Sequence, residues 1–193
     1  MKERLDREYF EKLYEQSSDP WGFATSPYER RKYERTLDVL QDCQRGYRNV
    51  LEVGCSIGVF TGMLAPLCDE LCAVDVSEKA VAAARKRLAD FPHVRVEQRR
   101  LPEETPEGPF DLIVASEVLY YWPKEVMLVA LRRLEEILAS GGALLAVHWR
   151  RETKTYPLQG DEVHELLLEH THLVNTTTIV EPEYRLNLFR DRE

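Results

Sequence analysis

The chain has 193 residues, a formal net charge of −8 and a sequence pI near 5.3. An acidic chain is poorly suited to the phosphate backbone of nucleic acid or to an anionic membrane surface, so we expect a small-molecule partner. The N-terminus is charged, without an apolar core of secretory length, and no apolar run approaches the ~20 residues of a membrane span. These features predict a cytoplasmic protein and leave its oligomeric state open.

The length suits one α/β domain, because no linker rich in Pro, Gly or Ser divides the chain. We expect residues 1–45 to form a helical cap and residues 46–193 to form the core. The four cysteines are expected to be reduced and mostly buried. Cys68 and Cys72 stand four residues apart, but no second pair or nearby histidine completes a zinc set, so no metal site is expected.

The first 25 residues predict a helix followed by an aromatic loop. Apolar residues recur at helical spacing from about residue 5 to 16, which indicates an amphipathic lid or edge helix. Residues 17–25 contain Pro, Gly and Ser and predict a loop, yet this loop carries Trp21 and Phe23. Two interpretations stay open for these aromatics: packing on the protein's own core, or closing over a bound ligand.

A helix start follows at Ser26-Pro27-Tyr28-Glu29, where Ser26 suits the N-cap, Pro27 the first turn and Glu29 a capping box. The helix is expected to run to about Gln44. Its first turns are crowded with cations, which gain nothing from the positive end of the helix dipole. Either a ligand carboxylate or a solvated basic face explains this cluster of Arg30, Arg31, Lys32 and Arg35.

The stretch Val50–Phe60 is the strongest functional signal in the chain. A short apolar strand leads into Gly54, and Gly58 opens the next helix, where a missing side chain would let an anionic ligand group approach. Ser56 replaces the second glycine of the dinucleotide fingerprint, which disfavours a pyrophosphate. Glu52 is an acidic residue inside an apolar strand, so we expect it to face a buried ligand end that carries ammonium or amide donors.

A second carboxylate ends the next predicted strand, residues 71–76. Asp75 stands 21 residues beyond Gly54, the spacing at which doubly wound folds place an acceptor for ribose hydroxyls. The alternative is a surface aspartate or an N-cap. Ser77 is the better N-cap for the helix predicted at residues 78–88, which favours the ribose role.

The following elements bring further side chains to the same edge of a parallel sheet. Strands are predicted at residues 94–98, 109–115 and 143–147, with a helix at 123–139 and a turn at Gly141-Gly142. Glu117 and His148 come just after two of these strands, where ligands bind in open α/β sheets. His148 is either a general base or an edge-strand residue that stacks on Trp149.

The tail is predicted to hold a helix opened by Asp161 and carrying His164, then an antiparallel pair at residues 176–180 and 185–189. Strands alternate with helices up to residue 149, which predicts right-handed parallel crossovers. The expected fold class is therefore α/β: a Rossmann-like doubly wound sheet, mostly parallel, with an antiparallel C-terminal edge hairpin and an N-terminal helical lid.

The pattern Glu-x-Gly-x-x-x-Gly at residues 52–58 resembles motif I of class I S-adenosylmethionine-dependent methyltransferases. With Asp19-Pro20-Trp21, residues 26–29 and residues 116–121, the chain resembles the nodulation protein S family of N-methyltransferases. The resemblance implies S-adenosylmethionine as cofactor and methyl donor. An Asp in many such enzymes receives the adenine amino group where this chain has Arg100, so the expected substitutes are a backbone carbonyl near Arg100 or Leu101 and an apolar slot, with Arg100 stacking on the ring. The expected cofactor-binding residues are Trp21, Lys32, Glu52, Gly54, Cys55, Gly58, Asp75, Val76, Arg100, Leu101 and Glu117.

The resemblance favours N-methylation of a small amine or amino sugar, with Glu117 and His148 as the candidate catalytic residues. An O-methyltransferase on the same scaffold is the second hypothesis, because a hydroxyl acceptor benefits from a general base. A non-catalytic S-adenosylmethionine-binding regulatory subunit is the third, and aminopropyl transfer is a minor further alternative. The aromatic and ionisable residues at 116–122 and 148–150 argue against a degraded acceptor site.

Overall fold

The computed structural model describes residues 2–44 and 46–191. The chain divides into two compact units, one of Arg7–Arg99 and one of Met1–Asp6 with Arg100–Glu193. This division lies at residue 99, whereas the sequence interpretation placed the boundary between cap and core at residue 45.

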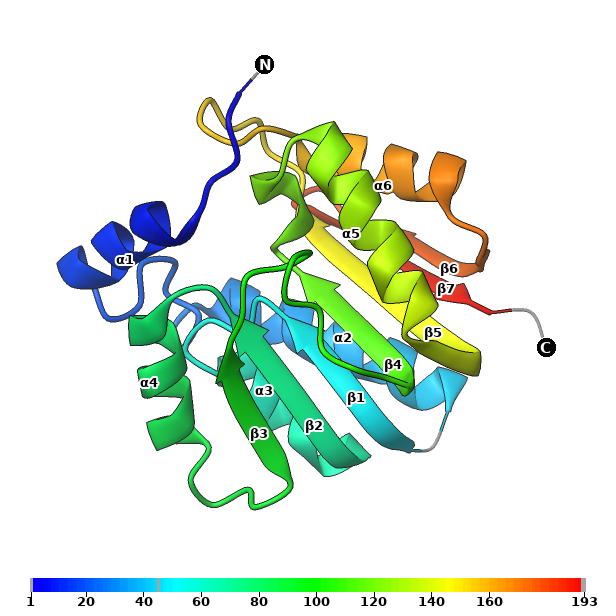
Figure 1. The fold of residues 1–193 in the computed structure, drawn as a ribbon, viewed down its shortest axis with the longest axis horizontal. Helices are drawn as coiled ribbons and strands as arrows, with labels where there is room; N and C mark the ends of the chain where they lie inside the picture. Colours follow the sequence, from blue (N-terminus) through cyan, green and yellow to red (C-terminus); the bar gives the residue numbers. More distant parts are fainter. Residues whose placement is uncertain (1, 45, 192–193) are drawn as a thin grey trace. The chain divides into compact units, whose positions relative to one another are not determined.

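The unit Arg7–Arg99 carries three parallel strands in the order β3-β2-β1 (Figure 1). Among its helices, α4 packs on β2 and β3 and also contacts α1 and α3. Its elements in chain order are α1 (Arg7–Gln16), α2 (Pro27–Cys43), β1 (Tyr47–Val53), α3 (Val59–Leu64), the 3-10 helix η1 (Ala65–Leu67), β2 (Cys68–Asp75), α4 (Glu78–Arg87) and β3 (Val94–Gln98).

Local capping explains where the helices of this unit begin. Ser26 accepts the amide hydrogen of Glu29 at 3.3 Å and caps α2, as predicted. Ser77 caps α4 through the amide of Ala80 at 3.1 Å, also as predicted. The first helix starts at Arg7, two residues later than the sequence pattern indicated.

The second unit carries four strands in the order β4-β5-β7-β6. Strands β4 and β5 are parallel, whereas β7 runs antiparallel to both β5 and β6. Helix α6 packs on β5 and β7 and contacts α5. The elements are β4 (Phe110–Ser116), the 3-10 helix η2 (Leu119–Tyr121), α5 (Lys124–Glu136), β5 (Leu138–Trp149), α6 (Gly160–His170), β6 (Val174–Val180) and β7 (Tyr184–Arg190).

Strand β5 is longer than predicted, and the turn expected at Gly141-Gly142 is wrong. Both glycines lie inside the strand, at an irregularity where the partners shift from Phe110 opposite Leu138 to Leu112 opposite Ala143. Gly141 adopts a φ of 71°, which a residue without a Cβ tolerates. The glycines therefore form a bulge that re-aligns β5, and the preceding helix ends at Glu136 rather than near residue 139.

The buried face of α5 agrees only in part with the apolar side that the sequence predicts, which consists of Val126, Val129, Leu131, Leu134 and Leu138. Its buried residues are Met127, Ala130, Leu131 and Leu134, which follow the i, i+3, i+4, i+7 pattern. Val129, expected in the core, keeps 39% of its surface exposed. The apolar pattern of this helix supports two candidate stripes, and tertiary packing selected the one centred on Leu131.

The fold class is confirmed as α/β, with mostly parallel strands and an antiparallel C-terminal pair. In the first unit the carboxyl ends of β1 and β2 lead directly to Gly54 and Asp75. In the second unit the ends of β4 and β5 deliver Glu117 and His148. Each unit thus presents one pair of the residues singled out from the sequence.

Candidate functional site

The loop after β1 has three residues with positive φ. Gly54 and Gly58 have φ values of 77° and 76°, and Ser56 between them has a φ of 50°. The amides of Gly54 and Cys55 both donate to the carbonyl oxygen of Val74, at 2.8 and 3.0 Å. The left-handed conformation of Ser56, costly for a residue with a Cβ, is the kind of local strain found at ligand sites.

Gly58 has a packing role that the sequence interpretation missed. A Cβ built on it would lie 3.0 Å from Leu88 and 3.1 Å from Ala84, both at the C-terminal end of α4. The glycine is therefore required by its backbone conformation and by the close approach of this helix end. Its proposed contact with a ligand stays a prediction.

Asp75 is held by two backbone amides of its own unit. Its Oδ2 accepts from Ser56 at 2.8 Å, and its Oδ1 accepts from Ser77 at 2.9 Å. Burial raises the pKa of Asp75 to about 6, although these amide donors favour the ionised form. Each carboxylate oxygen can accept more than one hydrogen bond, so both can still take a ligand hydroxyl. Val76, the next residue, is half-buried.

Glu52 is a buried carboxylate inside strand β1. It is 3% exposed, and its Oε2 has no hydrogen-bond partner in the part of the chain that the structure describes. Burial raises the pKa of Glu52 to about 7, the Thr61 hydroxyl lowers it and nearby Asp75 raises it. An unsatisfied buried acceptor is costly, so this atom fits a ligand ammonium group.

The Cys55 side chain takes part in core packing, and a contact of Cys55 with the cofactor stays a prediction. This side chain is 4% exposed and packs in an apolar cluster under α4. Burial raises the pKa of the Cys55 thiol well above its ordinary value, which keeps it protonated and unreactive.

Helix α1 and the aromatic loop contact the same unit through residues that sequence reasoning overlooked. The hydroxyls of Tyr14 and Ser56 are 2.5 Å apart. Trp21 is half-buried, stacks on Phe23 with ring centroids 5.5 Å apart, and meets the ring of Tyr14 at 5.8 Å. Trp21 thus packs on its own unit, the first of the two interpretations, and closure over a ligand stays a prediction.

Lys32 is the one buried cation of the basic cluster on α2. It is 2% exposed, its Nζ lies 2.8 Å from the Glu29 carboxylate and 5.4 Å from the centre of the Tyr28 ring. Arg31 and Arg35 are exposed. Burial of Lys32 beside a carboxylate and an aromatic ring accounts for its position without a ligand, and its cofactor role stays a prediction.

The residues expected at an adenine ring are held by the N-terminal segment. Arg100 donates to Asp6 and Glu103, and the Arg4 guanidinium donates to the carbonyl oxygen of Leu101. Leu101 itself is 4% exposed. The contacts of Arg100 with Asp6 and of Arg4 with Leu101 join residues more than ninety positions apart, so local sequence patterns do not reveal them.

Glu117 lies at the end of β4 with a positive φ of 56°. Its Oε2 accepts from the Tyr120 hydroxyl at 2.5 Å and from the Trp149 amide at 3.0 Å. Burial and the nearby Glu117 carboxylate raise the pKa of Tyr120 well above its ordinary value, so Tyr120 acts as the donor. The carboxylate is therefore oriented by two fixed donors on a strained backbone.

His148 is completely buried, and both of its ring nitrogens face hydrogen-bonding partners. The amide of Leu119 donates to Nε2 at 3.2 Å, and Nδ1 lies 3.3 Å from Nε2 of His164. A general base needs a free lone pair within reach of the acceptor. The geometry therefore favours a structural role for His148, and its role as a base stays a prediction.

Tyr156 joins this region although it lies in a polar loop without a motif. Its ring stacks on Tyr120 with centroids 4.9 Å apart and meets Tyr121 edge-on at 4.8 Å. Tyr120 and Tyr121 are buried, whereas Tyr156 is half-buried. The three rings form an apolar wall next to the Glu117 carboxylate.

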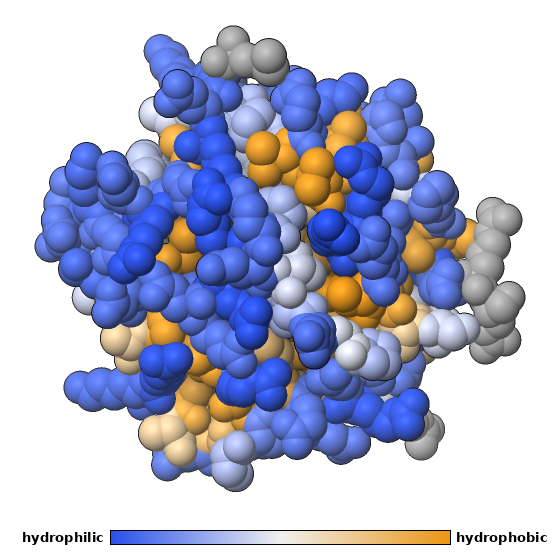
Figure 2. Space-filling model, viewed as in Figure 1, coloured by the Kyte–Doolittle hydropathy of each residue, from blue (hydrophilic) through white to orange (hydrophobic). Residues whose placement is uncertain are grey.

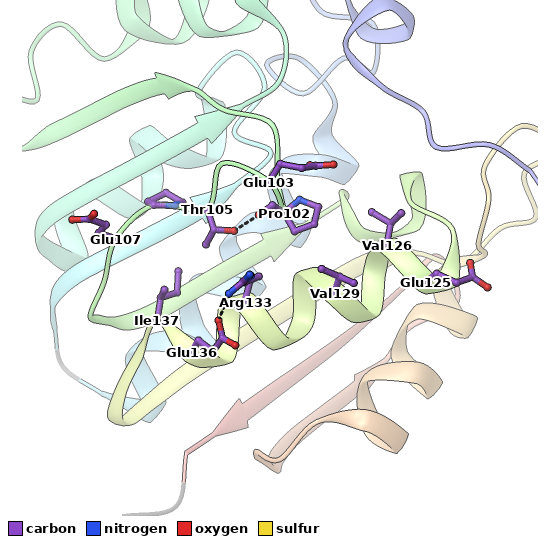
Figure 3. Close-up of a pocket in the computed structure, with 11 residues that line it drawn as sticks. Pro102, Glu103, Thr105, Glu107, Glu125, Val126, Val129, Arg133, Glu136 and Ile137 are labelled. Atoms are coloured by element: carbon purple, nitrogen blue, oxygen red, sulfur yellow. Dashed lines mark hydrogen bonds and ion pairs between the residues drawn. The ribbon is translucent and has the colours of Figure 1, made fainter.

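A separate groove of about 660 Å³ runs between the loop after Arg100 and α5 (Figure 3). Val126, Val129 and Ile137 supply apolar surface on its α5 side, and apolar atoms are visible over this helix in Figure 2. None of the predicted cofactor-binding or catalytic residues lines it.

No group of three or more His, Cys, Asp or Glu residues is arranged to hold a metal ion within residues 2–44 and 46–191. Over the same ranges, every helix is too short or too polar to cross a membrane.

The family model of nodulation protein S (NodS) matches residues 6–156. The chain belongs to the NodS family. A nodulation protein S of Rhizobium tropici is 37% identical over 130 residues, covering 67% of this chain and 54% of that protein. Another, from Bradyrhizobium diazoefficiens, is 38% identical over 128 residues, covering 66% and 61%. The chain thus spans a little over half the length of these curated relatives.

The fold of the NodS family extends over nearly the whole chain. The crystal structure of the N-methyltransferase NodS from Bradyrhizobium japonicum WM9 in complex with S-adenosylhomocysteine superposes with a TM-score of 0.85 at 27% identity. The match covers 97% of this chain and 98% of that one. The resemblance inferred from motif I and the flanking motifs is therefore confirmed at the level of family and fold.

Proposed function

We propose that this NodS-family chain is an S-adenosylmethionine-dependent methyltransferase that methylates the nitrogen of a small-molecule amine. The observation that carries the proposal is Glu52, whose buried carboxylate oxygen has no hydrogen-bond partner among the described residues. An amino-acid ammonium group would satisfy it, and the cofactor carries one. The NodS N-methyltransferase with 27% identity was crystallised with S-adenosylhomocysteine, which supports the same cofactor here.

The residues of the first unit fit this cofactor by their chemistry. Asp75 offers two carboxylate oxygens to ribose hydroxyls, and its pKa near 6 leaves it ionised at neutral pH. Glu52 takes the ammonium end, and the backbone of Gly54 and Cys55 forms the floor. When bound, the cofactor supplies an electrophilic methyl group on a sulfonium sulfur.

The residues of the second unit are assigned to the acceptor. An ammonium acceptor must lose a proton before its nitrogen lone pair can attack the methyl carbon. Glu117 accepts that proton, directly or through a water, while Tyr120 and Trp149 keep the carboxylate oriented. As the new N–C bond forms, the C–S bond electrons pass to sulfur. The ring wall around Tyr156 excludes water and offers a face for an apolar or sugar-like acceptor.

The test is methyl transfer from isotopically labelled S-adenosylmethionine to a panel of amino sugars, simple amines and hydroxylated metabolites, read by mass spectrometry. We expect label on nitrogen in at least one amine. Label on hydroxyl groups alone would replace the proposal with O-methylation. Cofactor binding with no transfer to any amine would favour the non-catalytic binding subunit.

A further inference from the structure

The second unit contains a row of buried polar side chains that the proposed reaction does not use. His148 on β5, His164 on α6 and Asn187 on β7 are each 0% exposed. Nε2 of His164 is 3.3 Å from Nδ1 of His148, and its Nδ1 is 2.7 Å from Oδ1 of Asn187. Buried polar groups of this kind are costly unless each one is hydrogen-bonded. The donor and the acceptor of each contact can therefore be inferred from its neighbours.

The Leu119 amide, at one end of this row, determines which atom is the donor in each of its hydrogen bonds. The amide of Leu119 can only donate, so Nε2 of His148 must carry a lone pair and its proton must sit on Nδ1. That proton points at Nε2 of His164, which must therefore be the acceptor. The remaining proton of His164 is then on Nδ1 and points at Asn187. Both histidines are neutral, since a second proton on either ring would place two donors face to face.

Asn187 completes the row in the orientation that this direction requires. Its Oδ1 accepts from His164, and its Nδ2 donates to the Thr178 hydroxyl at 2.7 Å. One strand, one helix and a second strand thus contribute one member each. All hydrogen bonds of the row therefore run in the same direction. The acceptor at its end, Nε2 of His148, receives the hydrogen bond of the Leu119 amide.

Leu119 is the first residue of η2, the turn that carries Tyr120. The amide of a first helical residue has no partner inside its own turn, so an outside acceptor is needed. His148 supplies it, and its ring also meets the Tyr120 ring edge-on at 5.1 Å. The Tyr120 hydroxyl then donates to Glu117 at 2.5 Å.

Close packing of α6 on β5 makes this row possible. A Cβ on Gly160 would lie 2.0 Å from the carbonyl oxygen of Trp149 and 3.4 Å from Cβ of His148. Gly160 and His164 stand one turn apart on the same face of α6. The glycine therefore lets the helix approach closely enough for His164 to reach His148.

We propose that His148, His164 and Asn187 form a positioning relay, which fixes the η2 turn and through it the contact between Tyr120 and Glu117. None of the three touches the acceptor in this scheme. The inference rests on the proposed function for its catalytic consequence, whereas the tautomers and the held Leu119 amide are properties of the folded chain alone.

The direct test is nitrogen-15 NMR of the histidine rings together with hydrogen exchange of the Leu119 amide, and neither needs an acceptor. Both rings should carry their proton on Nδ1. His148→Leu should speed exchange of Leu119 about tenfold or more, whereas His148→Gln, which can accept and donate in the same order, should stay within about threefold. A proton on Nε2 of His148, or unchanged exchange in His148→Leu, would overturn the relay.

Kinetic measurements distinguish a positioning role of the relay from a contribution to the stability of the fold. His164→Leu should lower kcat about tenfold while KM for the acceptor and the Kd of S-adenosylhomocysteine change less than about threefold. Val163→Ala, a neighbouring buried site on α6, is the matched control for lost packing. Equal losses of kcat in the two variants at equal Tm would overturn the positioning role. If no amine is methylated, the proposed function fails, and the NMR and exchange results decide the relay by themselves.

Discussion

The loop after β1 and the turn after β4 both hold a carboxylate near the end of a parallel strand, but they do so by different means. Asp75 is bound by the amides of Ser56 and Ser77, and burial raises its pKa to about 6. Glu117 is bound by Tyr120, whose turn depends on buried side chains from three other elements. The first arrangement is encoded in a short motif, whereas the second is encoded in long-range packing.

The largest expected effect is on turnover, and it distinguishes the role of Glu117 from that of Asp75. Glu117→Gln preserves an acceptor for Tyr120 and Trp149 but removes the base, so turnover should fall by about 100-fold or more. The Kd of S-adenosylhomocysteine, measured by calorimetry, should stay within about threefold. A lost cofactor affinity with unchanged turnover at saturation would move Glu117 to the cofactor side and return His148 to consideration as the base.

Asp75→Ala should have the opposite signature. Removing a charged hydrogen-bond partner costs about 1–3 kcal/mol, so cofactor affinity should fall roughly 5- to 150-fold. Asp69→Ala, an exposed aspartate on the same strand, is the control and should leave the titration unchanged. Equal affinities for the unaltered protein and Asp75→Ala would remove the ribose assignment.

Gly160→Ala probes the long-range arrangement without touching a polar group. Its Cβ would overlap the Trp149 carbonyl oxygen, and a forced backbone shift costs about 1–3 kcal/mol of unfolding free energy. That corresponds to a drop in Tm of about 2–4 °C per kcal/mol. Gly62→Ala is the control, because its Cβ would lie at an ordinary 3.5 Å from Leu88. A Gly160→Ala protein as stable as Gly62→Ala would show that α6 does not need this close approach.

The last expected effect is a pH dependence of cofactor binding. Burial raises the pKa of Asp75 to about 6 and of Glu52 to about 7. Their contribution to the stability of the ligand-free protein is therefore present below their unfolded values and is lost as pH rises through 6 and 7. A cofactor that needs both carboxylates ionised should bind about 100-fold more tightly at pH 7.5 than at pH 5.5, with most of the change coming from Glu52.

The measurement for this dependence is the Tm shift that S-adenosylhomocysteine produces at each pH. Taking the difference between bound and free protein removes the contribution of His164. Burial lowers the pKa of His164, so its contribution runs the other way, with stability falling as pH drops below 6.5. A larger Tm shift at pH 5.5 than at pH 7.5 would contradict the assignment of the two carboxylates.

The sequence predicted what depends on neighbouring residues. The strand before Gly54, the cap at Ser26, the cap at Ser77 and the antiparallel C-terminal pair were all readable from local patterns. Glu52 was identified because a carboxylate in an apolar strand is costly, and the structure buries it without a full set of partners. Local chemistry was sufficient at these positions.

The sequence did not predict what depends on distant contacts. The bulge at Gly141-Gly142 exists because β5 must re-align with β4, and the choice of the buried stripe on α5 was made by its neighbours. His148 looked like a base because it follows a strand. Its burial and its bond to His164, sixteen residues away, are set by how closely α6 approaches β5.

The most direct test of the central claim is a calorimetric titration of the unaltered protein with S-adenosylhomocysteine at pH 7.5. One cofactor molecule per chain should bind, and Asp75→Ala should weaken the binding while Glu117→Gln leaves it nearly unchanged. Undetectable binding by the folded, unaltered protein would contradict the cofactor assignment and the methyl transfer built on it.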